Sequence, residues 1–120
     1  MKDLDFNSDE FSDITARDDR YAGGAYVLLA DVVGYLGKDG RHFHAEDILD
    51  EFKETALDYF GPMTYTVLTE WGVKCTEDIG EMMFNLVESK RFRRDEGVDT
   101  QESFAGGYDF AEAFLGPYEP

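Results

Sequence analysis

The stretch "AEDILDEFKETALDYFGP", residues 45–62, decides the fold class because it carries two different surfaces at helical spacing. Its apolar residues recur every three or four positions and so line one side of a helix, while acidic residues fill the other side. These apolar residues are Ile48, Leu49, Phe52, Ala56, Tyr59 and Phe60. Gly61 suits the left-handed position after a helix, and Pro62 suits the first turn of the next one. The sequence therefore predicts a helix over residues 45–60 and a sharp turn after it.

The segment 22–36 is apolar on nearly every side, unlike the helix over 45–60. A helix of this kind lies at the centre of a domain, or it covers its second face at a contact between subunits. We therefore expect a central helix, with a homodimer through residues 22–36 as one option. Its β-branched and aromatic residues leave a strand as the alternative secondary structure.

Residues 62–90 have the order helix, turn, helix. The first helix is expected over 62–71 and ends at Gly72, and Thr76 is a natural N-cap for a second helix that reaches about Lys90. The expected core of the four helices is Leu28, Phe52, Leu68, Trp71, Ile79 and Leu86.

The ends of the chain differ from this helical part. Residues 1–19 are rich in acids and lack a helical pattern, which predicts a solvated, flexible arm that only Phe6 and Phe11 could dock. Short helices are expected up to Phe104 and after Asp109, and residues 117–120 form a tail.

Together these segments predict an all-α or α-dominated single domain over residues 20–116. It has five to six helices, and a short hairpin near residues 90–99 would give it a winged-helix-like arrangement.

Composition limits the partners. The chain holds 27 Asp and Glu against 11 Lys and Arg, a formal net charge of −16. Most of its surface therefore repels nucleic acid and anionic lipid, so a partner that binds by charge should be a basic or amphipathic protein. Salt adaptation of the host is the alternative source of the acidity.

Location follows from cysteine use and from the N-terminus. Cys75 is the single cysteine, and "MKDLDFNSDEF" lacks the basic and apolar regions of a secretory signal. The longest apolar run contains Asp31 and several glycines and is too short for a membrane span. We expect a cytoplasmic protein that has no contact with a membrane.

Three segments, "FGPMTYTVL", "EWGVKCTEDIGEMMFNLVE" and "YDFAEAF", resemble those of a small bacterial family described mainly as restricted to Planctomycetes and Verrucomicrobia. The resemblance also includes Tyr21, Ala25, Tyr26 and the pair Arg41 and His42, and it covers roughly residues 20–115. The acidic arm, Cys75 and "KRFRR" depart from the family pattern. The resemblance implies one compact bacterial domain, and it carries no activity, substrate, cofactor or catalytic residue over to this chain.

Few residues have the spacing of a catalytic or metal site. His42 and His44, followed by Glu46 and Asp47, have a spacing that could hold a metal, but a third ligand is missing and a solvated loop is the more frequent explanation. Cys75 has no assured histidine partner that would activate it. Paired carboxylates occur throughout the chain, so none of them indicates acid–base catalysis. We expect neither an enzyme nor a cofactor.

The basic residues Lys90, Arg91, Arg93 and Arg94 are the one group able to contact an anion or an acidic partner. They follow a helix–turn–helix order, as the wing of a DNA-binding domain does. The second helix, however, offers acids where base-reading side chains are needed, and only Asn85 is suitable. An internal counter-charge is the alternative role of this basic stretch.

Three functions remain. The first is a non-catalytic protein-interaction module, a small acidic adaptor or regulator that binds a basic or amphipathic protein. The second is a nucleic-acid-associated regulator that uses residues 62–90 and the basic wing over 90–94. The third is an acidic mimic of nucleic acid that occupies a DNA-binding protein.

Overall fold

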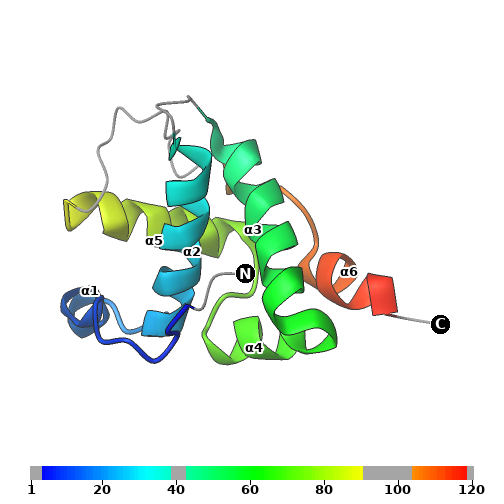
Figure 1. The fold of residues 1–120 in the computed structure, drawn as a ribbon, viewed down its shortest axis with the longest axis horizontal. Coiled ribbons are helices and arrows are strands. Elements are labelled where there is room, and N and C mark those ends of the chain that lie inside the picture. The colour runs from blue at the N-terminus through cyan, green and yellow to red at the C-terminus, as the bar shows by residue number, and fades with distance from the viewer. Residues whose placement is uncertain (1–3, 39–42, 91–103, 119–120) are drawn as a thin grey trace.

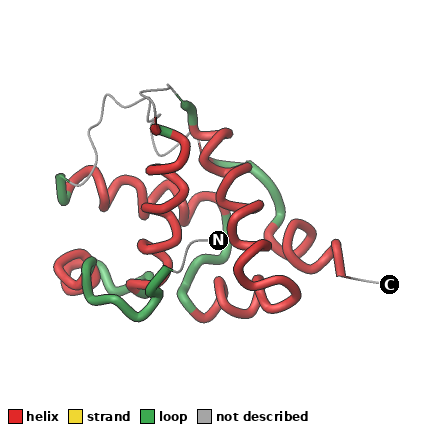
Figure 2. The backbone as a smooth tube through the Cα atoms, in the orientation of Figure 1, coloured by secondary structure: helices red, strands yellow, loops and turns green. Residues whose placement is uncertain are grey.

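The expected helix over 45–60 is present with those bounds as α3, Ala45–Phe60. The computed structural model describes residues 4–38, 43–90 and 104–118, and within them the chain forms helices and connecting loops without strands (Figure 2). The other elements are α1 Ser12–Arg17, α2 Gly23–Leu36, η2 Gly61–Met63, α4 Thr64–Glu70, α5 Thr76–Glu88, α6 Phe110–Leu115 and η4 Gly116–Tyr118. The predicted single all-α domain is confirmed. The hairpin near 90–99 lies outside the described residues, apart from Lys90.

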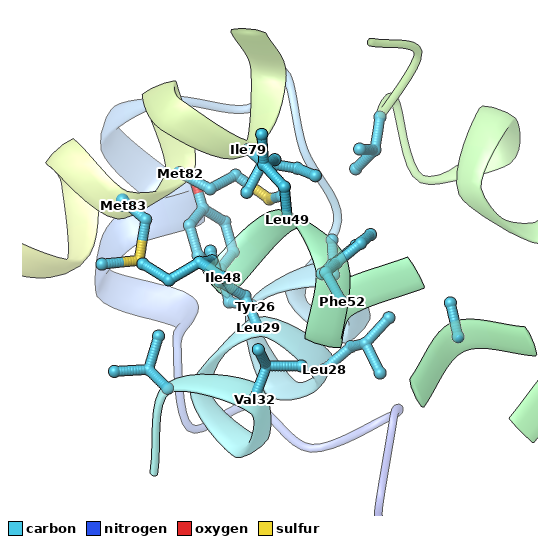
Figure 3. Close-up of a cluster of buried hydrophobic side chains, with 14 of the residues drawn as sticks. Tyr26, Leu28, Leu29, Val32, Ile48, Leu49, Phe52, Ile79, Met82 and Met83 are labelled. Atoms are coloured by element: carbon cyan, nitrogen blue, oxygen red, sulfur yellow. The ribbon is translucent and has the colours of Figure 1, made fainter. Parts of the chain in front are cut away.

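α2 is the central helix, and α3 packs along its length while α5 crosses both (Figure 1). Side chains from these three helices meet in the core (Figure 3). Tyr26, Leu28 and Leu29 of α2 are fully buried there. Most of the apolar residues around α2 are therefore buried within the chain, and a homodimer through residues 22–36 stays a prediction.

The turn after α3 forms as the sequence predicts. Gly61 has a positive φ of 52°, and Pro62 lies at the start of η2. The Thr64 hydroxyl donates a hydrogen bond of 2.6 Å to the Gly61 carbonyl oxygen, which fixes the reversal of the chain. α4 consequently runs back beside α3.

α4, the turn and α5 have the expected helix–turn–helix order. Gly72 has a φ of 90°, which side chains with a Cβ rarely adopt, and the Val73 amide closes the turn on the Leu68 carbonyl oxygen at 2.9 Å. The prediction of Thr76 as N-cap is wrong, because Cys75 occupies that position. Thr76 is buried instead, and its hydroxyl accepts a hydrogen bond of 3.1 Å from the Gly107 amide.

The predicted solvated arm is wrong for residues 4–19, which pack against the domain. Phe11 and Ile14 are buried in the core, with α1 between residues 12 and 17. The Ala22 amide then donates to the Trp71 carbonyl oxygen at 3.0 Å, next to the helix–turn–helix turn. Apolar side chains in an acidic segment thus pack it against the domain.

The predicted core is confirmed except at one residue. Leu28, Phe52, Leu68, Ile79 and Leu86 are fully buried, whereas Trp71 is only partly buried. It lies at the C-cap of α4, on the surface of the core rather than inside it. None of the helices within the described residues has the length and apolar character that a membrane span requires.

Candidate functional site

The face of α5 that a DNA-binding helix would present is bound to the segment before α2. Tyr21 donates a hydrogen bond of 2.6 Å from its hydroxyl to Asp78 Oδ1. Asn85 donates to Asp18 Oδ2 at 3.0 Å and to the Tyr26 hydroxyl at 2.9 Å. Asp78 and Asn85 lie two turns apart, so these contacts hold one side of α5, whereas Glu77, Phe84 and Glu88 of the same helix stay exposed.

Arg20 supplies positive charge to this contact. Its guanidinium holds Asp18 with two charge-assisted hydrogen bonds, of 2.9 Å from Nε and 2.6 Å from Nη2, and it reaches Glu81 at 3.4 Å. The hydrogen bond from Arg20 lowers the pKa of Asp18 well below its ordinary value of 3.8. This part of α5 therefore has a counter-charge that does not come from residues 90–94.

The tyrosines in this contact are structural. Burial raises the pKa of Tyr21, and the hydrogen bond to Asp78 raises it further. Burial also raises the pKa of Tyr26. Both hydroxyls therefore stay protonated, and each is already in a hydrogen bond.

The thiol of Cys75 lies 3.5 Å from Asp78 Oδ2, in a partly buried position. Burial raises its pKa, and the neighbouring carboxylate acts in the same direction. A protonated thiol is a weak nucleophile. The surroundings of Cys75 thus lack the activation that covalent catalysis requires.

Of the two histidines with the spacing of metal ligands, the structure describes only His44. His42 lies outside the described residues. His44 is exposed in the N-cap position of α3, and its backbone amide donates to the Asp47 carboxylate at 2.8 Å. Its position is that of a helix start. Within the described residues, no group of three or more His, Cys, Asp or Glu is arranged to hold a metal ion.

Of the basic stretch, only Lys90 is described. It is exposed, follows Ser89, the C-cap of α5, and has a positive φ of 65°. Arg91, Arg93 and Arg94 lie outside the described residues, so their role as an anion or partner contact stays a prediction.

A second candidate site is a group of aromatic rings at the surface, which the sequence did not reveal. The ring centroid of Phe6 lies 5.4 Å from Tyr59, 5.2 Å from Phe60 and 5.5 Å from Trp71. Phe60 and Trp71 also meet edge to face at 5.5 Å. All four side chains are only partly buried. We call Phe6, Tyr59, Phe60 and Trp71 the aromatic surface cluster.

This cluster brings together the N-terminal segment, the end of α3 and the end of α4. Helical spacing placed Tyr59 and Phe60 on the apolar stripe of α3, and α4 ends where Trp71 begins the turn. The contact of Phe6 with them spans about half of the chain, so no local pattern predicts it. The exposed side chain of Met63 follows in η2, 56% accessible.

Exposed acids flank the aromatic surface cluster. Asp5 precedes Phe6, Asp58 precedes Tyr59 and Glu70 precedes Trp71, and we call these three exposed carboxylates the acidic rim. Neither residues 3–16 nor residues 54–73 contain Lys or Arg. The chain segments that build the cluster therefore supply no positive charge of their own.

Carboxylates also form a row along α3. Asp47, Glu51, Glu54 and Asp58 recur every three or four residues and face solvent to differing degrees. Neighbouring positions in such a row lie about 5–6 Å apart. We call these four residues the carboxylate row, and it meets the acidic rim at Asp58.

The chain matches no protein-family model, and neither a curated protein nor a solved structure is significantly similar to it. The family resemblance of the three segments therefore stays an expectation.

Proposed function

We propose that this chain is a non-catalytic protein-interaction module, an acidic adaptor or regulator that binds a basic, amphipathic protein segment. The observation that carries the proposal is the aromatic surface cluster together with its acidic rim. Aromatic side chains dominate the binding energy of many protein interfaces, because they bury a large area at low cost in conformational entropy. An acidic surround attracts Lys and Arg and accelerates association with a basic partner.

The rim explains why the partner should be basic. Asp5, Asp58 and Glu70 would meet any incoming acidic segment with like charge, and residues 3–16 and 54–73, which build the cluster, contain no Lys or Arg. Screening at physiological salt acts over about 8 Å, so charges at the edge of a bound segment remain effective. The single cysteine and this partner class fit a protein of the reducing cytoplasm.

A second candidate is favoured by the carboxylate row of α3. Acids at regular spacing along a rigid helix resemble the charge of a nucleic-acid backbone, so this face would suit a DNA-binding protein as a mimic. The aromatic surface cluster has no role in that function. The two candidate functions therefore predict that substitutions at different residues reduce binding of the partner.

Two charge-matched variants separate them. Glu70→Lys reverses a rim carboxylate that lies outside the row, and Glu54→Lys reverses a row carboxylate that lies outside the rim. Both are used as baits in native lysate at low and moderate salt, with and without nuclease, and circular dichroism checks their folds. The proposal expects nuclease-resistant capture that only the rim variant loses. Loss of capture in the α3 variant alone would favour the nucleic-acid mimic. Capture that nuclease abolishes would contradict both candidate functions.

A second pair of variants tests whether the rings of the aromatic surface cluster bind the partner. Tyr59→Ala removes a partly buried ring from the cluster, whereas Phe84→Ala removes an exposed ring, 40% accessible, from α5. We expect Tyr59→Ala to reduce capture and Phe84→Ala to leave it unchanged. Equal losses would contradict a binding site at the cluster.

A further inference from the structure

The ring of Phe6 lies among the other three rings of the aromatic surface cluster, although Phe6 belongs to the N-terminal segment of the chain. Its ring contacts those of Tyr59, Phe60 and Trp71, with centroids 5.2 to 5.5 Å away. Phe60 and Trp71 also contact each other at 5.5 Å. Three rings from α3 and α4 thus form a seat, and a side chain of the N-terminal segment fills it.

The seat also requires a glycine at the start of α2. A Cβ on Gly24 would lie 2.9 Å from the Phe6 carbonyl oxygen and 2.7 Å from Cζ2 of Trp71. Both distances are shorter than a real Cβ contact allows. Gly24 is therefore a close-packing position that lets the chain at Phe6 pass beside the Trp71 ring.

The segment that carries Phe6 forms hydrogen bonds within itself, while Leu4 and Phe6 pack against the core as partly buried side chains. The Asn7 amide donates to the Asp5 carboxylate at 3.0 Å, and the Ser8 amide donates to the Asp5 carbonyl oxygen at 3.1 Å. These bonds join residues 5–8 to one another and not to the rest of the domain, so we expect them to fray once the ring leaves the seat. Phe11, 3% exposed, anchors the chain to the core a few residues later. Displacement of Phe6 therefore leaves the core intact.

Charge works against the seated segment. Asp5 and Asp9 are exposed carboxylates of the segment that carries Phe6, and Asp58 and Glu70 are next in sequence to rings of its seat. Like charges brought near one another repel, and the repulsion is stronger at low salt. Burial of the Phe6 ring must offset this repulsion. A basic segment with a similar ring would gain the same burial and attraction in addition.

We propose that residues 4–10 are a displaceable plug, and that the partner is a Lys- or Arg-rich segment whose aromatic side chain replaces Phe6. This inference rests on the proposed function, because it names the partner chemistry and the regulation of the same site. Binding would carry Asp5 away with the segment, and Asp58 and Glu70 would remain to attract the basic partner. The apparent affinity of the partner is then reduced by the fraction of molecules in which the plug is seated.

The test uses Trp71 as a reporter, since it is the single tryptophan of the chain and lies in the seat. The probe is a synthetic Lys-rich peptide with one Phe, and the control peptide has Ala in its place. We expect Phe6→Ala to bind the Phe peptide about tenfold more tightly than wild type, with a change in Trp71 fluorescence. Phe84→Ala should bind as wild type does, and the control peptide should bind both proteins weakly.

A second measurement needs no substitution. Hydrogen exchange of the wild type, saturated with the Phe peptide, should become faster at the Asn7 and Ser8 amides, because the plug has left its seat. Equal affinities of wild type and Phe6→Ala with unchanged exchange at these amides would overturn the plug and leave the proposed function standing. Absence of binding to either protein would overturn both.

Discussion

The side-chain amide of Asn85 donates a hydrogen bond of 3.0 Å to the Asp18 carboxylate, across a sequence separation of 67 residues. The contact joins the segment before α2 to the outer face of α5. It also engages the one side chain of α5 that suits the reading of a base. The relationship therefore bears on the stability of the fold and on the nucleic-acid hypothesis.

The first prediction concerns pH. Arg20 lowers the folded-state pKa of Asp18 below its ordinary value of 3.8, so ionised Asp18 stabilises the fold above about pH 4. This contribution is lost as pH falls through the folded-state pKa. We expect Asp18→Asn to reduce the free energy of unfolding by about 1 kcal/mol at neutral pH, because Arg20 is half exposed and solvent screens the pair.

Urea denaturation between pH 2.5 and 7 checks this. The difference between wild type and Asp18→Asn should be constant at pH 5 to 7 and shrink below about pH 4. Asp19→Asn, at the exposed neighbouring position, is the control and should stay close to wild type. A difference that does not change with pH would contradict the role of the Asp18 charge.

The second prediction compares two glycines. Gly72 has a φ of 90°, and a Cβ there would lie 2.1 Å from the Arg20 carbonyl oxygen. Gly72→Ala should therefore cost at least about 2 kcal/mol of folding free energy. Gly34 lies exposed within α2 with open space around it, so Gly34→Ala should stabilise by about 0.5–1 kcal/mol. Thermal unfolding followed by circular dichroism measures both, and similar midpoints for the two variants would contradict the turn geometry.

The third prediction tests the core. Leu86 is fully buried on α5, so Leu86→Ala should cost about 2–5 kcal/mol through lost burial and a residual cavity. Thr66→Ala, at an exposed position of α4, should change the free energy of unfolding by less than about 0.5 kcal/mol. An unchanged denaturation midpoint for Leu86→Ala would show that this face of α5 is not packed.

The helices could be predicted from sequence because their signals are local. Apolar spacing set α3, and Gly61 with Pro62 set its end, while Asp109 caps α6 by accepting from the Glu112 amide at 3.0 Å. The N-cap of a helix is harder to predict where two neighbouring residues could occupy that position. Thr76 has a good N-cap side chain, but its hydroxyl bonds to Gly107, a distant partner that no local pattern reveals.

The candidate site could not be predicted because its contacts are long-range. Phe6 lies in a segment whose acidity indicates a solvated arm, and only the rings of α3 and α4 give it a partner. Trp71 is the residue type expected in a core, yet its place at the end of α4 puts it at the surface. For the same reason, the sequence suggested Asn85 as a base reader, whereas residues 18–26 engage it.

The last prediction concerns nucleic acid. We expect the purified protein not to bind generic duplex DNA measurably at physiological salt, despite the order of α4 and α5. Asn85 is engaged by Asp18 and Tyr26, and Asp78 and Glu81 on the same face would approach phosphates with like charge. Four basic residues, 90, 91, 93 and 94, would release few counterions, and the affinity they add falls with a log–log slope of about −0.9 per phosphate as salt rises.

Fluorescence anisotropy with random duplex and single-stranded oligonucleotides at two salt concentrations tests this expectation. The matched variant changes Arg91, Arg93 and Arg94 to Glu, which removes the basic stretch without altering the residues that contact Asn85. If repulsion dominates, wild type and variant give the same flat titration at physiological salt. Micromolar binding by wild type that weakens with salt and disappears in the variant would favour a nucleic-acid partner over a basic protein. The contact of Asn85 with Asp18 would then have to open on binding, and Asp18→Asn should strengthen the complex.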